Sequence, residues 1–261
     1  MNLLLKRISQ SYYSTTALMG IKKEDVFLVS FPKSGNTWVK FILLNVLFEA
    51  GELNKDISFK SLDETIPEIS RDNLLKNWNY KVLPRFIKSH IVYNKLFFKN
   101  NRSLLIIRDP RDVMVSYFHY ALNTQGFNFN KNFQAFIRHK RFGLEACMLH
   151  QVSWQNRASA IVKYEDLKKK GDEILLQAMY KLNIHLEKNL LHKAFENASF
   201  ANMKKLDQSS KKYKNIHNEG YRFMRKGDER QWHEYFNEND LTYYNNLIKK
   251  HKNIYTNYYE S

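Results

Sequence analysis

One stretch, residues 26–51, constrains the fold of this chain more than any other. It reads VFLVSFPKSGNTWVKFILLNVLFEAG. Its first residues, Val26 to Phe31, are apolar and partly β-branched, which predicts a buried strand. From about Trp38 the apolar residues cover a broad face, which predicts a helix. A buried strand that turns directly into a helix is typical of α/β proteins, so we expect a central parallel sheet flanked by helices.

The turn between this strand and helix has the features of an anion cradle. Pro32 fixes the exit from the strand, and Gly35 allows a close approach of the backbone. The first amides of a helix point outward, where partial positive charge gathers. The donors expected around such an anion are the Lys33 ammonium, the Ser34 and Thr37 hydroxyls, and the amides of Asn36, Thr37 and Trp38. The turn alone would also fit a purely structural role.

The order of residues 32–38, PKSGNTW, differs from the usual loop of nucleotide triphosphatases, which needs G-x-x-x-x-G-K-[ST]. It resembles instead the 5′-phosphosulfate loop of the sulfotransferases, which use 3′-phosphoadenylyl sulfate (PAPS). Members of that family usually carry Thr where this chain has Asn36, a mild departure because Asn still offers a donor. The resemblance implies the sulfotransferase fold, with residues 33–38 binding the 5′ end of PAPS.

Length and charge narrow the class of protein. The 261 residues fit one large domain, and we find no repeat or linker. We therefore expect a single sulfotransferase domain over 1–261, with 1–24 as an N-terminal arm. Lys and Arg outnumber Asp and Glu by 42 to 26, for a net charge of +16. This surplus favours an anionic ligand, a nucleic acid or an acidic membrane, although runs such as 168–170 are typical of a solvated surface.

Other features bear on location and assembly. A single cysteine, Cys147, excludes an internal disulfide and suits a reducing cytosol. The chain has no run of about 18 apolar residues, and its N-terminal apolar block is too short for a secretory signal. We therefore expect a cytoplasmic protein without stable membrane insertion. The helix expected over 240–251 lacks the short dimerisation motif of many cytosolic members, so the sequence does not predict an oligomeric state.

A second motif follows a short apolar strand around Phe86 and Ile87. The strand ends in Lys88, Ser89 and His90, and ligand sites of open α/β sheets gather at the carboxyl ends of strands. A lone histidine is more often a surface or core residue. Lys-Ser-His nevertheless resembles the family's Lys-Thr-His, which implies His90 as catalytic base and Lys88 as an aid at the sulfuryl oxygens. The other histidines form no H-E-x-x-H or Cys/His grouping, so we expect no metal.

A third motif follows the next predicted strand, 103–107. A helix comes next, and Arg108 and Ser116 fall in the pattern R-[DN]-x-x-D-x-x-x-S. This pattern resembles the family's 3′-phosphate site, which implies that both residues bind that phosphate. The alternative is structural, because Arg108 and Asp112 could simply pair as a local salt bridge.

Two later segments resemble the family's adenine site. The strand expected over 159–167 contains Tyr-Glu-Asp-Leu, a family box that places Tyr164 near the adenine. Amphipathic helices are expected over 172–183 and 187–197. After them, Phe200 resembles the aromatic residue that covers the adenine face.

The last match is a basic segment near residue 226. Arg225, Lys226 and Gly227 resemble the family's R-K-G, which folds over the 3′-phosphate. Two adjacent cations beside a flexible glycine suit a dianion. The family continues with glycine and aspartate, where this chain has Arg230 and Gln231. The conformation after Gly227 therefore stays open at this point.

These matches occur in family order from residue 31 to 232 and imply a PAPS-dependent sulfotransferase. Lys33, Thr37 and the loop amides would neutralise charge on the leaving phosphate while His90 takes the acceptor's proton. We expect a small-molecule or glycan acceptor that attacks through oxygen or nitrogen. The residues expected to line its pocket are Phe31, Phe118, Tyr120 and the loop around 121–132.

Two other classes of function fit part of the pattern. A P-loop kinase-like phosphotransferase would use the same strand, loop and helix for ATP, but it needs Mg²⁺ ligands and a second glycine. A basic nucleic-acid-binding protein would explain the net charge. The aromatic residues follow core periodicity, however, and no recognition motif appears, so we expect no nucleic-acid partner.

Overall fold

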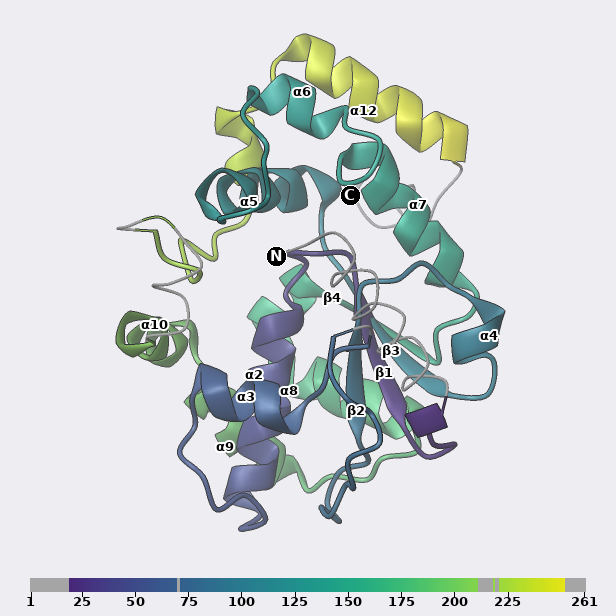
Figure 1. Ribbon diagram of the computed structural model, residues 1–261, viewed down its shortest axis with the longest axis vertical. Coiled ribbons are helices and arrows are strands. Elements are labelled where there is room, and N and C mark those ends of the chain that lie inside the picture. Colours follow the sequence, from purple (N-terminus) through teal and green to yellow (C-terminus); the bar gives the residue numbers. More distant parts are fainter. Residues whose placement is uncertain (1–18, 70, 211–217, 219–220, 252–261) are drawn as a thin grey trace.

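Four parallel strands form the centre of the structure, a computed structural model that describes residues 19–69, 71–210, 218 and 221–251. In sheet order the strands are β2 (Phe86–Ser89), β1 (Val26–Ser30), β3 (Arg102–Ile107) and β4 (Ala160–Lys163). Each neighbouring pair is parallel, so the carboxyl ends of the strands meet at one edge of the sheet (Figure 1). The predicted α/β fold with a central parallel sheet is confirmed.

The strands send alternate side chains to two apolar cores. Val26 and Leu28 of β1 belong to one buried cluster, whereas Phe27 and Val29 belong to another. This is the period of two that a pleated strand imposes. All five residues of β1 are buried, because helices cover both faces of a parallel sheet.

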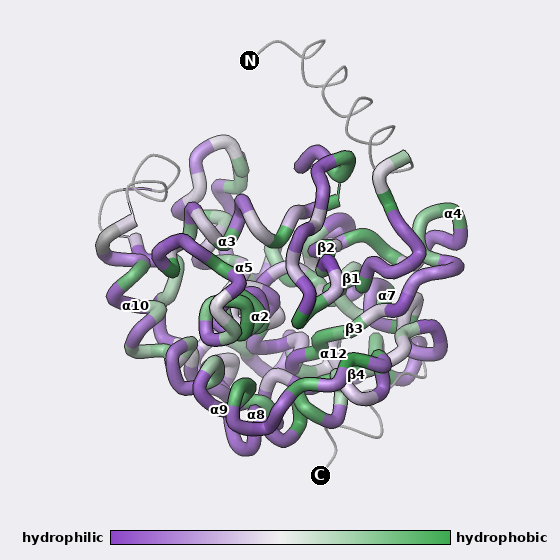
Figure 2. Tube along the Cα trace, turned by 90° about the horizontal axis from the view of Figure 1, so that it is seen from below, coloured by the Kyte–Doolittle hydropathy of each residue, from purple (hydrophilic) through white to green (hydrophobic). Residues whose placement is uncertain are grey.

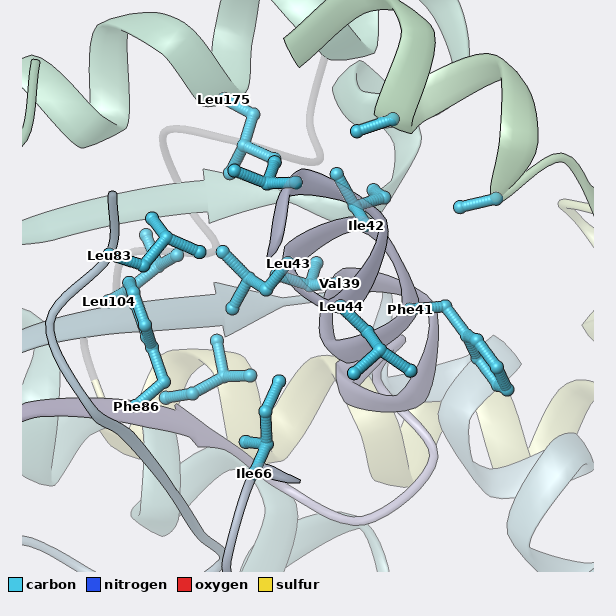
Figure 3. Packing of buried hydrophobic residues seen from close by; sticks show 14 of the residues in the cluster. Val39, Phe41, Ile42, Leu43, Leu44, Ile66, Leu83, Phe86, Leu104 and Leu175 are labelled. Atoms are coloured by element: carbon cyan, nitrogen blue, oxygen red, sulfur yellow. The ribbon is translucent and has the colours of Figure 1, made fainter. Parts of the chain in front are cut away.

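The first face of the sheet is covered by α2, which follows the phosphate-loop candidate directly. Ten of its residues are buried, on almost every side of the helix, as expected of a helix enclosed by other elements. Figure 3 shows its side chains packed among Phe86, Leu104 and Leu175. The helices of this layer are α2 (Asn36–Glu49), α3 (Phe59–Thr65), α8 (Tyr164–Lys181) and α9 (Lys188–Asn197).

The remaining helices cover the second face and the region beyond the carboxyl edge. Phe98 and Trp154 pack on the second face. A third apolar cluster lies beyond the carboxyl edge and includes Phe31, Met114 and Phe136. The elements concerned are α4 (Lys95–Phe98), α5 (Pro110–Asn123), α6 (Phe133–Ile137), α7 (Leu144–Gln155), the 3₁₀ helix η1 (Gln231–Glu234) and α12 (Glu238–His251). The helix α10 (Phe200–Ser209) packs Met203 into the cluster of the first face instead.

One predicted strand is wrong in its second half. The sequence predicts a strand over 159–167, but β4 ends at Lys163 and α8 begins at Tyr164. Two acidic residues in the first turn favour this helix start, since carboxylates stabilise the positive end of a helix. The helix expected from 172 is the second part of α8, which is kinked at Lys170 (φ −140°, ψ 52°).

The predicted N-terminal arm, 1–24, lies mostly outside the described residues. Where the chain is described, Figure 2 shows apolar residues gathered in α2 and the strands, with many hydrophilic segments around them. No helix in this part of the chain is both long enough and apolar enough to span a bilayer.

Candidate active site

A cavity of about 750 Å³ collects the predicted site residues. It is lined by the loop 32–38, the end of β2, α5, the start of α8 and the segment 221–231. Lys33 and His90 therefore line the same cavity, as do Arg108 and Arg225. Of the residues predicted for catalysis or cofactor binding, only Ser34 is absent from the lining, and its side chain is fully buried.

The loop before α2 is a tight turn with two residues at positive φ. Lys33 has φ 69° and Gly35 has φ 104°, and Gly35 is the N-cap of α2. A Cβ at Gly35 would lie 2.6 Å from Cδ2 of Tyr164. Glycine is therefore required both for the backbone angle and for the close approach of α8. This packing positions the first turn of α2 over the carboxyl edge of the sheet.

Two of the expected donors in the loop are used internally. The amide of Trp38 donates to the Gly35 carbonyl at 3.0 Å. The side-chain amide of Asn36 donates to the Leu28 carbonyl at 3.3 Å and to Ser30 Oγ at 3.2 Å. The prediction that the Trp38 backbone amide and the Asn36 side-chain amide would face the anion is therefore wrong. A helix's first N–H groups have no partner within the helix, so the backbone amides of residues 36 and 37 remain suited to a ligand.

The Lys33 ammonium lies among aromatic rings and other cations. Its Nζ is 3.8 Å from the ring centroid of Phe223 and 4.8 Å from that of Tyr120. Burial, together with the nearby charges of Arg108 and Lys88, lowers the pKa of Lys33 to about 7. An anion placed beside Lys33 would reverse this effect, because an opposite charge favours the protonated form.

His90 is held with one ring nitrogen toward the sheet. Its Nδ1 lies 2.7 Å from the Ser30 carbonyl oxygen. Because a carbonyl can only accept, Nδ1 carries the proton and Nε2 keeps its lone pair. Burial, and then the charge of Lys88, lower the pKa of His90 to about 3. The ring is therefore neutral at physiological pH and able to accept a proton at Nε2.

Glu68 is a site residue that the sequence did not predict. Its carboxylate lies 3.0 Å from the Lys88 Nζ, and it lines the cavity. The backbone fixes this pair, since the Lys88 amide donates to Pro67 at 2.8 Å and its carbonyl accepts from Ile69 at 2.9 Å. Burial raises the pKa of Glu68, but the charge and hydrogen bond of Lys88, with the charge of Arg71, outweigh burial and leave it lowered. No periodic pattern in 63–70 marks this residue.

Arg108 is buried at the end of β3, with an exposed fraction of 5%. It donates to the carbonyls of Lys33 at 3.4 Å and Asp228 at 3.1 Å, and its guanidinium lies 4.4 Å from the Tyr164 ring centroid. Its Nε is buried without a hydrogen-bond partner. A buried unpaired donor is costly, so this side chain is suited to an additional acceptor such as a phosphate oxygen.

Asp112 does not form the local salt bridge considered for it. It accepts instead from the backbone amides of Arg230 at 2.7 Å and Trp232 at 3.2 Å. The side chain therefore fastens the segment after the basic R-K-G sequence to α5, the helix that also carries Ser116.

The basic segment 225–227 closes over the cavity. Gly227 has φ 72°, and a Cβ there would lie 2.7 Å from Phe200 Cε2. The Gly227 carbonyl accepts from the Tyr164 hydroxyl at 3.3 Å and the Lys168 ammonium at 3.0 Å. Farther along, Arg230 takes the left-handed conformation (φ 59°). The chain thus adopts, with a non-glycine residue, a backbone angle that glycine favours.

Aromatic rings form a wall of the cavity between the loop 32–38 and the basic segment 225–227. Trp38 contacts Tyr164 and Phe195 edge-on, with ring centroids 5.7 and 5.3 Å apart, and its indole N–H donates to the Ala198 carbonyl at 3.0 Å. Phe200 completes this wall beside Gly227. Flat apolar walls of this kind suit a purine ring.

A second group of aromatic residues lines the same cavity and consists of Tyr117, Tyr120, Phe127, Tyr221 and Phe223. Tyr120 and, from the loop 121–132, Phe127 line the cavity, and their contact with an acceptor stays a prediction. Phe31 and Phe118 pack instead in the apolar cluster beyond the sheet. They support the pocket from behind and do not line it.

The fold and the cavity define a class of protein: an α/β enzyme of the nucleotide-binding type, with a helix N-terminus and several cations facing one site. A family model described as "Sulfotransferase domain" matches residues 23–256. The chain therefore belongs to the sulfotransferase family, and it is a sulfotransferase enzyme. Within the described residues no group of three or more His, Cys, Asp or Glu could hold a metal ion.

Several curated proteins are similar in sequence. Amine sulfotransferase of Oryctolagus cuniculus is 30% identical over 236 residues, which cover 81% of this chain and 75% of the relative. Luciferin sulfotransferase of Photinus pyralis is 26% identical over 267 residues, covering 88% of this chain and 72% of the relative.

Solved structures share the fold. Retinol dehydratase in complex with androsterone and inactive cofactor PAP matches with a TM-score of 0.69 and 19% identity, covering 94% of this chain and 85% of that one. Mouse sulfotransferase SULT7A1 complexed with PAP matches with a TM-score of 0.63 and 20% identity, covering 92% and 90%.

Proposed function

We propose that this enzyme transfers the sulfuryl group of PAPS to a hydroxyl or amine of a small-molecule or glycan acceptor. The observation that carries the proposal is the common cavity. Lys33 and the first residues of α2 line it together with Arg108 and Arg225, and His90 lines the same space with Nε2 as its unprotonated ring nitrogen. A doubly phosphorylated nucleotide needs several cations in one site.

The buried groups of the site fit this donor. Arg108 lines the cavity and its Nε is buried without a hydrogen-bond partner, and a phosphate oxygen would supply the missing acceptor. Lys33, Thr37 and the amides of residues 36 and 37 would hold the 5′ end. Arg108, Ser116 and residues 225–227 would hold the 3′-phosphate, with the adenine between Trp38, Tyr164 and Phe200.

In the reaction, the acceptor's oxygen or nitrogen attacks sulfur while the bond from sulfur to the 5′-phosphate oxygen breaks. The acceptor's proton moves to His90 Nε2, and the leaving product is adenosine 3′,5′-bisphosphate (PAP). Lys33 neutralises the charge that develops on the 5′-phosphate, and Lys88 stabilises the sulfuryl oxygens. Group transfers of this type depend mainly on holding the attacking atom, the sulfur and the leaving oxygen in line.

The surroundings of the site support two further parts of the proposal. The second group of aromatic residues in the cavity suits a ring-bearing acceptor such as a phenol, a sterol or a sugar. Cys147 is free and buried, which agrees with a reducing compartment, and we include a cytoplasmic location in the proposal.

The proposal can be tested with ³⁵S-labelled PAPS and a panel of hydroxylated and amino compounds. We expect label to pass to at least one acceptor, with one PAP released per transfer and no requirement for Mg²⁺. The matched control is the His90→Ala variant, which should bind PAP but transfer label about 10²–10⁴ times more slowly. Mg²⁺-dependent phosphate transfer from ATP, with PAPS left intact, would support the kinase alternative instead.

A further inference from the structure

Gln231 is a buried amide linked to two arginines of the proposed 3′-phosphate site, to Arg225 directly and to Arg108 through a carbonyl that both side chains share. It begins η1, has an exposed fraction of 8% and lines the cavity. We propose that Gln231 is a positioning residue that fixes Arg225 and Arg108 for the 3′-phosphate. This inference rests on the proposed function, because the phosphate is that of PAPS.

The contact with Arg225 is direct. An Arg225 guanidinium nitrogen donates to the side-chain carbonyl oxygen of Gln231. A long arginine side chain loses rotamer freedom when it binds a ligand, and a partner that already orients it reduces this cost. Because the partner is a neutral amide, it orients the guanidinium without neutralising its charge.

The contact with Arg108 runs through one backbone carbonyl. The Gln231 side-chain N–H donates to the Asp228 carbonyl at 2.8 Å, and Arg108 donates to the same oxygen at 3.1 Å. One oxygen thus accepts from both side chains. Gln231 therefore sets the position of the peptide against which Arg108 is aligned.

Asp112 fixes Gln231 in turn. Its carboxylate accepts from the amides of Arg230 and Trp232, the residues on either side of Gln231. The backbone on both sides of Gln231 is therefore hydrogen-bonded to Asp112 of α5. Asp112 itself lies four residues after Arg108 in the sequence. The result is a closed set of contacts in which the two arginines, one from β3 and one from the basic segment, keep a fixed separation.

The test compares two nucleotides that differ only in the 3′-phosphate, PAP and adenosine 5′-monophosphate, by isothermal titration calorimetry. We expect Gln231→Leu to weaken PAP binding about tenfold, since hydrogen bonds to charged groups are among the stronger ones. Binding of the monophosphate should change less than twofold. Gln134→Leu is the matched control, because the Gln134 side chain also donates a hydrogen bond, to the Asp240 carboxylate at 3.4 Å, but lies on α6.

A second variant separates charge from position. Gln231→Glu keeps the size and the acceptor for Arg225 but adds a negative charge beside the phosphate, so PAP binding should weaken at least as much as in Gln231→Leu. If Gln231→Leu does not fold, the PAP affinity of Gln231→Glu tests the role of Gln231 instead.

The outcomes are distinguishable. Equal losses for both nucleotides, or no loss for PAP, would overturn the role assigned to Gln231. If the unmodified protein binds PAP no more tightly than the monophosphate, the proposed function itself fails, whatever the variants do.

Discussion

Binding of PAP should take up a proton at Lys33. In the ligand-free protein the pKa of Lys33 is lowered to about 7, first by burial and then by Arg108, Lys88 and other nearby cations. The 5′-phosphate of PAP would place negative charge beside the ammonium. An opposite charge within a few ångströms raises the pKa of a lysine, so the bound state should hold Lys33 fully protonated.

The size of the uptake follows from the two pKa values. With a pKa of about 7, roughly half of the Lys33 side chains are protonated at pH 7 and about one tenth at pH 8. If binding restores a pKa near 10, the uptake is about 0.5 proton at pH 7 and about 0.9 at pH 8. By linkage, the affinity for PAP should fall by nearly tenfold for each pH unit above 8 until the bound-state pKa is reached.

The assay is isothermal titration calorimetry in two buffers of different ionisation enthalpy, such as HEPES and Tris, at pH 7 and pH 8. The difference in observed enthalpy gives the number of protons taken up. PAP itself contributes little at pH 8, because the second pKa of a phosphate monoester is about 6. The control is Lys33→Arg, since a guanidinium stays charged throughout this range.

Two results would refute this reasoning. An uptake below about 0.2 proton at pH 8 would mean that Lys33 is already charged in the free protein or stays neutral in the complex. An uptake that persists unchanged in Lys33→Arg would assign the proton to another group.

Three further predictions follow from the site. His90→Ala should lower turnover by about 10²–10⁴ while PAP affinity stays within twofold, and a normal rate in this variant would remove His90 from the chemistry. Arg108→Ala should weaken PAP binding at least tenfold but change turnover at saturating PAPS much less, so unchanged affinity by calorimetry contradicts its role. Gly35→Ala should lower the free energy of unfolding in urea by about 1–3 kcal/mol, because its Cβ would meet Tyr164 at 2.6 Å. Gly51→Ala, at a position that shares the positive φ but has open space around it, should lower the free energy of unfolding by less. Equal decreases in the two variants would show that the contact with Tyr164 does not matter for stability.

The parts of the site that could be predicted lie in short continuous segments. The strand, turn and helix of 26–51 and the residues after β2 and β3 follow from local periodicity and from the rule that parallel strands end at one edge. The structure accordingly brings Lys33, His90 and Arg108 into one cavity.

The parts that could not be predicted depend on contacts between distant segments. Glu68 meets Lys88 twenty residues later, and Asp112 meets Arg230 across 118 residues. Local pattern carries no information on such pairs. The kink at Lys170 has a similar cause, since it adjoins Gly171, where a Cβ would lie only 1.9 Å from the Phe195 ring. The approach of α9, which the sequence of α8 alone does not reveal, requires a glycine there.

A crystal structure with PAP bound tests the central claim most directly. The account predicts the 5′-phosphate at Lys33 and the first turn of α2, the 3′-phosphate between Arg108, Ser116 and Arg225, and His90 Nε2 facing the space next to the 5′-phosphate. A PAP molecule found outside this cavity, or bound with only one of its phosphates against these cations, would contradict it.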